Sequence, residues 1–214
     1  MKSLTIVIPA YNEEATVGDV AAAVKNAPLV EEVLVVSDGS TDRTVQRAHM
    51  AGARVIELLA RGGKGHAMCV GVEAAHTAFV MFLDADIYGI THEHVQKLFE
   101  PVERGQAVMS VGLRDRGALL VALMRLLPLV SGERCLSRTL FLSCPSGQLS
   151  GYRVEIALNA LCREKGGRIQ AILLTGVRIR TKVAKVGWRR GLWQYVRMWG
   201  QVAGALVASS WHKR

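Results

Sequence analysis

The chain has 214 residues, half of them apolar, and carries a formal net charge of +9. This length and apolar content suit one α/β domain with a sizeable core and exclude an intrinsically disordered chain. The four cysteines are widely spaced and form no CxxC pair, which argues against both a zinc site and a disulfide framework.

Short apolar runs alternate with helical patterns through the first half, as expected for a parallel sheet with crossover helices. Strands are predicted at Leu4–Ile8, Glu32–Val36, Arg54–Leu58, Phe79–Leu83 and Ala107–Val111. Helices are predicted at Glu13–Asn26, Thr41–Gly52, Gly65–Ala75 and Thr91–Arg104. The expected fold is therefore α/β and Rossmann-like, with a mostly parallel central sheet flanked by helices.

The order is less regular after residue 111. An apolar helical run at Ala118–Val130 is broken by an arginine and a proline, and it fits either a core segment or a membrane-facing flap. A helix at Tyr152–Glu164 and a strand at Ile169–Leu174 follow, with no sign of a domain boundary.

Polar segments follow four of the predicted strands: PAYNEE, SDGSTD, RGGKG and LDAD. In an open parallel sheet the carboxyl ends of the strands meet at one edge, where ligands bind. In LDAD, Asp84 and Asp86 follow a buried strand, and two such carboxylates suit a hard divalent cation that also takes diphosphate oxygens. Such an ion would neutralise the charge that builds on a departing phosphate.

The other polar residues allow two interpretations each. Asp38 and Glu13 are candidate acceptors for a nucleotide base, but both lie where helices are expected to begin and could serve as caps. RGGKG matches neither the dinucleotide nor the phosphate-loop pattern. Lys64 in that segment is either a ligand for a phosphate or base, or a solvated lysine in a glycine turn.

The four segments, in this order and spacing, resemble the family 2 glycosyltransferases, which have the glycosyltransferase-A fold. The opening IVIPAYNEEATV is nearly the family pattern, and the resemblance extends to about residue 115. It implies that Asp84 and Asp86 bind the metal, and that the nucleotide sugar is held by Pro9, Ala10, Tyr11, Glu13, Asp38, Lys64 and Asp84. Ser37 is a departure, because the family usually has Asp there.

The second half resembles polyprenyl-phosphate sugar transferases and glucosyl-3-phosphoglycerate synthases. The matching segments are VSGERCLSR, from Val130, and SGYRVEIALNALCREKG, from Ser150. The resemblance implies an acceptor-side loop in which Ser131, Gly132 and Arg134 contact the acceptor. It also implies that Glu155 lies near the reacting sugar, in a catalytic set with Asp86.

From the residues alone, alternatives remain open in this half. Arg134 could pair with an acceptor phosphate or form a surface ion pair with Glu133. Glu155 lies in the first turn of the expected helix, where it could be catalytic or could complement the helix dipole. Related sequences often place a metal-binding His about where Ile179 stands, so here water and diphosphate would complete the metal's ligands.

The C-terminal part is basic. From Lys165 to Arg214 there are 11 Lys and Arg, no Asp or Glu, and all four tryptophans. Trp and Arg on a helix favour a lipid interface over a nucleic-acid groove. The domain prediction is thus a catalytic domain at residues 1–186 and an interfacial helix at 187–214 that binds an anionic membrane surface. A helix packed on the body and a membrane span are the alternatives.

Together these features predict transfer of a hexose from a nucleoside diphosphate sugar to a phosphorylated acceptor, with Mg²⁺ or Mn²⁺ at Asp84 and Asp86. A polyprenyl phosphate is the preferred acceptor, and a small soluble acid is the alternative. PAYNEE in place of an early glycine-rich loop disfavours a nucleotidyltransferase, whereas a non-catalytic sugar-nucleotide binding module stays open. No secretion signal is evident, so we expect a cytoplasmic enzyme, peripheral on the inner face of the cell membrane. The sugar, the base, the stereochemical outcome and a possible homodimer are left open.

Overall fold

The computed structural model describes residues 4–114, 131–145 and 153–179. Its strands are β1 Leu4–Ala10, β2 Val30–Asp38, β3 Arg54–Leu58, β4 Phe79–Phe82, β5 Ile87–Tyr88, β6 Met109–Arg114, β7 Arg134–Ser137, β8 Ile169–Leu174 and β9 Arg178–Ile179. Its helices are α1 Val17–Lys25, α2 Thr44–Met50, α3 Lys64–Ala74, α4 His92–Glu103, α6 Arg138–Leu142 and α7 Arg153–Glu164.

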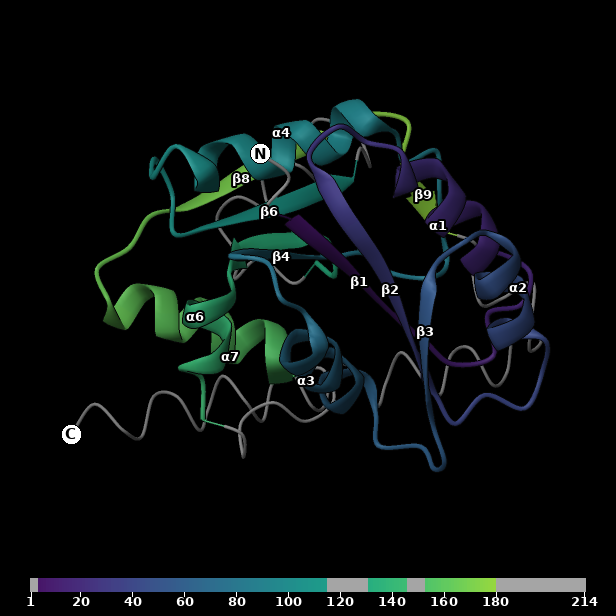
Figure 1. Ribbon diagram of the computed structural model, residues 1–214. Helices are drawn as coiled ribbons and strands as arrows, with labels where there is room; N and C mark the ends of the chain where they lie inside the picture. The colour runs from purple at the N-terminus through teal and green to yellow at the C-terminus, as the bar shows by residue number, and fades with distance from the viewer. Residues whose placement is uncertain (1–3, 115–130, 146–152, 180–214) are drawn as a thin grey trace, which may run out of the picture.

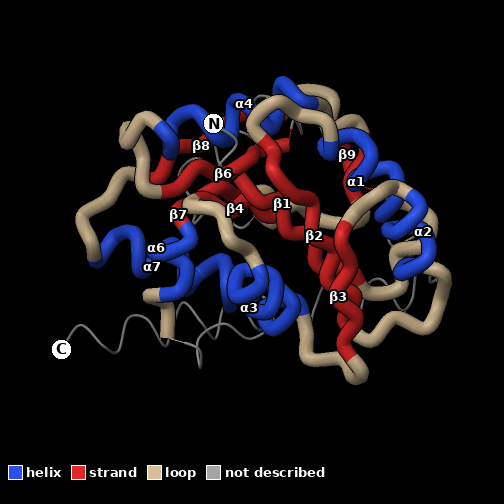
Figure 2. Tube along the Cα trace, viewed as in Figure 1, coloured by secondary structure: helices blue, strands red, loops and turns tan. Residues whose placement is uncertain are grey.

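A seven-stranded sheet in the order β3-β2-β1-β4-β7-β6-β8 forms the centre of the molecule (Figures 1 and 2). Neighbouring strands are parallel except at β7, which runs antiparallel to both β4 and β6. A second, two-stranded sheet pairs β5 with β9. The predicted α/β class with a mostly parallel sheet is therefore confirmed.

The two faces of the sheet bury separate apolar clusters because successive strand side chains point to opposite sides. Ile6 and Ile8 of β1 pack with α1, α2 and α4, whereas Val7 packs with α3, α6 and α7. Figure 1 shows these two groups of helices on opposite sides of the sheet. The sheet is thus covered on both faces, and its strand ends are left for a site.

Two predicted helix starts are wrong. α1 begins at Val17, four residues later than expected, and α2 begins at Thr44. The segment before α1 is instead held against the start of α2: Glu13 N–H donates to Thr44 Oγ1 at 2.8 Å, and Glu14 N–H donates to Asp42 Oδ2 at 3.2 Å. These two contacts hold residues 13 and 14 against the start of α2, and α1 begins only after them.

The predicted strands β3 and β8 have the bounds that the structure shows, but β7 was not predicted. Its sequence places a charged residue, Arg134, at the first position of a central strand, which disguises the strand pattern. The expected helix at Ala118–Val130 and the tail at 187–214 lie outside the described residues. In the ranges that the structure describes, no helix is long and apolar enough to cross a bilayer.

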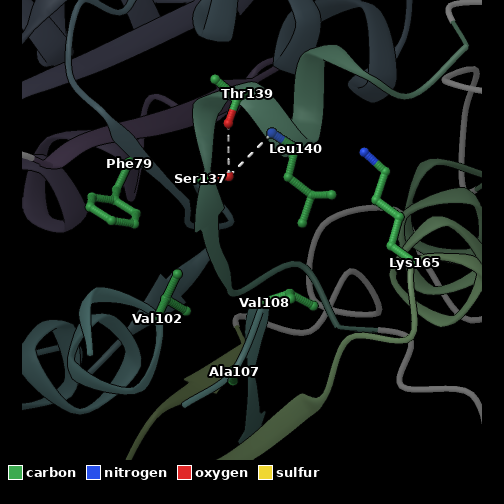
Figure 3. A pocket seen from close by; sticks show the side chains of 8 residues that line it. All are labelled: Phe79, Val102, Ala107, Val108, Ser137, Thr139, Leu140 and Lys165. Atoms are coloured by element: carbon green, nitrogen blue, oxygen red, sulfur yellow. Dashed lines mark hydrogen bonds between the residues drawn. The ribbon is translucent and has the colours of Figure 1, made fainter. Parts of the chain in front are cut away.

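An open cavity of about 370 Å³ lies where β4 and β6 begin and β7 ends (Figure 3). Phe79, Val102 and Val108 form its apolar wall, and Lys165 lies at its rim. This position is at the amino ends of the parallel strands, on the edge opposite to the polar segments. The candidate site must therefore be built from the polar side chains at the other edge.

Candidate active site

The polar segments do meet at the carboxyl ends of the parallel strands, as predicted. Tyr11 follows β1, Asp38 ends β2, Asp84 lies two residues after β4, and Arg114 ends β6. Because β7 runs in the opposite direction, the residues that enter it, including Gly132, lie at the same edge. One edge thus gathers groups from segments far apart in the sequence.

Asp38 braces the RGGKG segment. Its carboxylate is 4% exposed and accepts the N–H groups of Gly62 at 2.7 Å and Gly63 at 2.8 Å. Gly63 has φ +92°, a conformation that favours glycine. The helix-cap alternative for Asp38 is therefore wrong, because Asp42 accepts the N–H of Thr44 at the start of α2. A carboxylate has further lone pairs, so Asp38 can still accept a base N–H.

Tyr11 lies partly exposed at the same edge, with the guanidinium of Arg61 4.0 Å from its ring centroid. This cation–π contact joins the PAYNEE segment to the RGGKG segment. Pro9 and Ala10 form the last two positions of β1, and Ala10 is buried. Glu13 accepts a long hydrogen bond of 3.4 Å from the hydroxyl of Thr16. These residues lie at the carboxyl end of β1, on the edge that carries the site, and their nucleotide-binding role stays a prediction.

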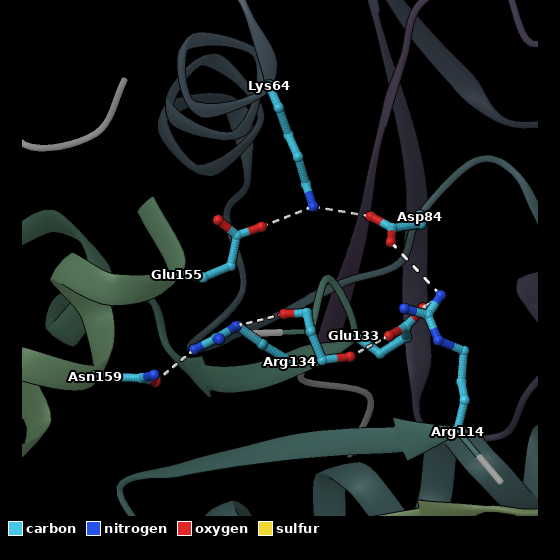
Figure 4. A network of polar contacts seen from close by, with 8 residues as sticks. Lys64, Asp84, Arg114, Glu133, Arg134, Glu155 and Asn159 are labelled. Carbon is cyan, nitrogen blue, oxygen red and sulfur yellow. Dashed lines mark hydrogen bonds and ion pairs between the residues drawn. The ribbon is translucent and has the colours of Figure 1, made fainter. Parts of the chain in front are cut away.

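Lys64 joins two carboxylates from distant parts of the chain (Figure 4). Its Nζ lies 2.9 Å from Asp84 Oδ1 and 2.9 Å from Glu155 Oε1. Burial disfavours the ammonium, but the two carboxylates outweigh burial and raise the pKa of Lys64. Lys64 is therefore a firmly charged cation at the centre of the site, and the solvated-lysine interpretation is wrong.

Glu155 lies in the first turn of α7, as predicted, but its side chain is only 3% exposed. Its Oε1 accepts from Lys64, while Oε2 is buried and has no hydrogen-bond partner among the residues that the structure describes. A buried acceptor without a partner costs about 1–3 kcal/mol, so such atoms usually have a reason to be there. A carboxylate that only complements the helix dipole does not have to be buried. The burial of Glu155 therefore favours a role in the site.

The other side of Asp84 faces Arg114 and the residues before β7. Arg114 Nη1 lies 3.3 Å from Glu133 Oε1 and 3.9 Å from Asp84 Oδ2. A Cβ on Gly132 would lie 2.1 Å from Asp84 Oδ1, so only glycine fits at this close approach. Glu133 is fully buried and accepts the Ser131 hydroxyl, and burial, reinforced by nearby Asp84, raises the pKa of Glu133. Gly132 thus lies directly against Asp84, whereas Ser131 contacts Glu133.

Arg134 is placed differently from both sequence interpretations. It is completely buried, so it forms no surface ion pair with Glu133 and presents no guanidinium at the surface for an acceptor phosphate. Its Nε donates to the Ser131 carbonyl at 2.7 Å and its Nη1 donates to Asn159 Oδ1 at 2.8 Å. The predicted contact between Arg134 and the acceptor is wrong, because the guanidinium points into the protein, between β7 and α7.

The carboxylates fit a hard divalent cation in part. Asp84 and Asp86 are half-buried oxygen donors in one turn, and the Lys64 ammonium shows that the space beside Asp84 holds positive charge. Within the described ranges, no three His, Cys, Asp or Glu side chains gather into a metal site. Ile179 pairs with Ile87, directly after Asp86. The position without a His therefore lies beside these carboxylates, and diphosphate and water oxygens would supply the remaining ligands.

Three residues of the network were missed from the sequence: Arg114, Glu133 and Asn159. Arg114 could have been found, because it ends a strand at the edge where the other polar segments were sought. Glu133 and Asn159 carried no such signal, since the strand that places Glu133 was not predicted and Asn159 lies within a helix.

Comparisons with known proteins agree with this geometry. Residues 5–157 match the family model described as Glycosyl transferase family 2. A glucosyl-3-phosphoglycerate synthase of Mycobacterium tuberculosis is 31% identical over 195 residues, which cover 73% of this chain and 60% of that protein. A 4,4'-diaponeurosporenoate glycosyltransferase of Staphylococcus aureus is 39% identical over 102 residues, or 45% of this chain and 27% of that protein. The chain thus spans less than two thirds of either relative.

The fold is also similar to crystal structures of the M. tuberculosis synthase. One contains Mn²⁺, uridine diphosphate and glucosyl-3-phosphoglycerate, with a TM-score of 0.73 and 30% identity over 84% of this chain and 72% of that one. Another contains Mg²⁺ and uridine diphosphate, with the same TM-score and coverage. The match supports the predicted glycosyltransferase-A fold.

Proposed function

This chain belongs to glycosyl transferase family 2, and we propose that it transfers a hexose from a nucleoside diphosphate sugar to a phosphorylated acceptor. One observation carries the proposal: Lys64 joins Asp84 and Glu155, at 2.9 Å each, at the edge of the sheet where parallel α/β folds bind ligands. An ordinary structural ion pair would not require two buried or half-buried carboxylates and an orphaned oxygen at this edge.

The donor's nucleotide is assigned to the wall formed by Tyr11, Asp38 and the RGGKG segment. Asp38 holds the backbone of that segment in place and keeps lone pairs for a base N–H. Relatives of similar fold are crystallised with uridine diphosphate or its glucose derivative, which makes UDP-glucose the first donor to test.

The diphosphate is assigned to Asp84 and Asp86 together with Mg²⁺ or Mn²⁺, which would supply Lewis-acid stabilisation of the departing phosphate. Lys64 lies beside Asp84 and carries a fixed positive charge, so it can also stabilise charge on the leaving group. Glu155, on the other side of Lys64, is assigned to the reacting sugar or to the incoming acceptor.

We favour a small phosphorylated acid as the acceptor. The relatives matched over most of the chain are named for transfer to phosphoglycerate, and crystal structures of one contain phosphoglyceric acid. Arg134, which was expected to hold the phosphate of either acceptor, is buried in the fold and so favours neither. The choice of a small acid reverses the preference derived from the sequence.

A polyprenyl phosphate is the second candidate, and with it a peripheral position on the membrane. The observation that favours it is the basic, tryptophan-rich sequence of residues 187–214, which suits an anionic lipid surface. The two acceptors are distinguished by supplying each, with UDP-glucose and Mn²⁺, to the same enzyme and identifying the glucosylated product.

The proposal is tested by nucleotide release from a panel of nucleoside diphosphate sugars. We expect release that requires Mg²⁺ or Mn²⁺, is abolished by excess EDTA and is lost in Asp86→Ala. Asp19→Ala, which removes an exposed carboxylate at the start of α1, is the matched control and should behave as the wild type. Absence of turnover with every donor, despite binding, would identify a sugar-nucleotide binding module instead.

A further inference from the structure

Arg134 is a buried cation that the proposed reaction does not use directly. It occupies the first position of β7, between β4 and β6 in the middle of the sheet, and is 0% exposed. Placing a guanidinium in such a position is costly, and burial lowers its pKa to about 10. An apolar side chain would suit this position in a central strand without the cost of burying a charge. The arginine therefore calls for a specific explanation.

The contacts of Arg134 lead to both halves of the site (Figure 4). Its Nε holds the carbonyl of Ser131 at 2.7 Å, directly before Gly132, whose backbone lies against the Asp84 carboxylate. Its Nη1 holds Asn159 Oδ1 at 2.8 Å. Asn159 lies one helical turn beyond Glu155 on α7, and residues four apart lie on the same face of a helix.

We propose that Arg134 and Asn159 are positioning residues that fix the spacing between Glu155 on α7 and Asp84 at the end of β4. The inference rests on the proposed function, because it assigns these two carboxylates to one reaction. The guanidinium provides two directed hydrogen bonds from a rigid plane, one toward each half of the site. A lysine or an apolar side chain in its place could not hold both partners at once.

Electrostatics act in the same direction. Glu155 contributes the largest of the charge interactions that favour the charged form of Arg134. The Glu155 carboxylate thus lies between Lys64, which it contacts, and the positive field of Arg134. Its Oε2 has no hydrogen bond within the described part of the chain. The pair Arg134 and Asn159, which we call the strut, therefore holds Glu155 in place without occupying the oxygen that faces away from Lys64.

The test replaces the strut with an apolar pair. Removing only one partner would leave a buried polar group unpaired and could unfold the protein. The double variant Arg134→Met with Asn159→Leu removes both side chains of their mutual hydrogen bond, and such replacements of a buried pair are often neutral or stabilising. The Ser131 carbonyl loses its donor in this variant, so thermal unfolding is measured beside kcat to show that the fold is retained. Leu158→Ala is the matched control, since it opens a cavity on the same buried face of α7 without touching the strut.

We expect the double variant to bind UDP-glucose and Mn²⁺ as the wild type does, while kcat falls about 10²-fold, the loss typical of a displacement near 1 Å. Leu158→Ala should lower Tm but keep kcat. A crystal structure of the double variant should show that the 2.9 Å contact between Lys64 and Glu155 is lost.

Two results would overturn the proposal. One is a double variant with wild-type kcat, and the other is a crystal structure in which the contact between Lys64 and Glu155 is unchanged, since any loss of rate would then come from the missing charge. If the wild type turns over no donor, the proposed function fails, and the distance between Lys64 and Glu155 in the variant decides the positioning role alone.

Discussion

Replacing Gly132 with alanine should disable the site while leaving the fold intact. The added Cβ would lie 2.1 Å from Asp84 Oδ1 and 2.4 Å from Oδ2, whereas ordinary contacts begin at 3.4 Å. The carboxylate must therefore move by about 1 Å, and a displacement of that size costs about 10²-fold in rate. This corresponds to about 2.7 kcal/mol of transition-state stabilisation.

The same substitution should change stability little. Asp84 is a short side chain at the edge of the sheet with 21% of its surface exposed, so it can rotate away from the new methyl group. The rotation breaks its ion pair with Lys64, and a partly exposed pair contributes at most about 1 kcal/mol. Mn²⁺ affinity in the presence of UDP should fall together with kcat.

The assay compares wild type, Gly132→Ala and Gly18→Ala by thermal unfolding, Mn²⁺–UDP titration and donor turnover. Gly18 is a suitable control, since its added Cβ would come no closer than 3.2 Å to any neighbour, the carbonyl oxygen of Arg47, within the packing of α1 on α2. Wild-type turnover and metal affinity in Gly132→Ala would refute the reasoning, because they would show that Asp84 need not stay where the structure places it.

Three further predictions address the charged network and the tail. Glu155→Gln should lower turnover by about one to three decades and leave UDP-glucose affinity unchanged in a titration; an equal loss of affinity would move Glu155 to the donor-binding set. Burial raises the pKa of Glu133, so the folded protein loses stability as pH rises above the ordinary glutamate value of 4.5. Glu133→Gln should escape this loss, so the Tm of the variant relative to the wild type should rise as the pH rises above 4.5, whereas a difference that does not change with pH would argue against a raised pKa. Truncation after Gly187 should abolish co-sedimentation with anionic vesicles and spare UDP binding, since each basic residue near such a surface contributes about 1 kcal/mol; failure of the full chain to sediment at low salt would contradict this.

The sequence predicted the parallel part of the sheet because apolar runs and turn residues mark those strands. Arg54–Leu58 and Ile169–Leu174 have the predicted bounds, and Asp84 lies at the strand end where a ligand site was expected. Such patterns are local in the sequence. Because ligands bind at the carboxyl ends of parallel strands, the predicted strands were enough to predict where the site lies.

The arrangement of β7 could not be predicted in this way. The strand has only four residues and begins with the charged Arg134. Its pairing partners, Phe79–Phe82 and Met109–Val111, lie far away in the chain. The expectation that Arg134 contacts an acceptor assumed a surface loop, and it is wrong because the segment is a central strand. The contact between Lys64 and Glu155 spans 91 positions, so no sequence periodicity could reveal it.

The reversed direction of β7 determines where the connection between β6 and β7 lies, and therefore where the sequence of this protein can vary. β6 ends with Arg114 and β7 begins with Arg134, so the chain leaves the sheet and re-enters it at the same edge, beside the donor carboxylates. The pairing of β6 with β7 fixes both ends of this connection at the same edge, Met109–Val111 against Arg134–Leu136. Variation in the length of the chain before Ser131 can therefore leave the β6–β7 register unchanged, whereas Ser131, Gly132 and Glu133 are constrained by their contacts in the site.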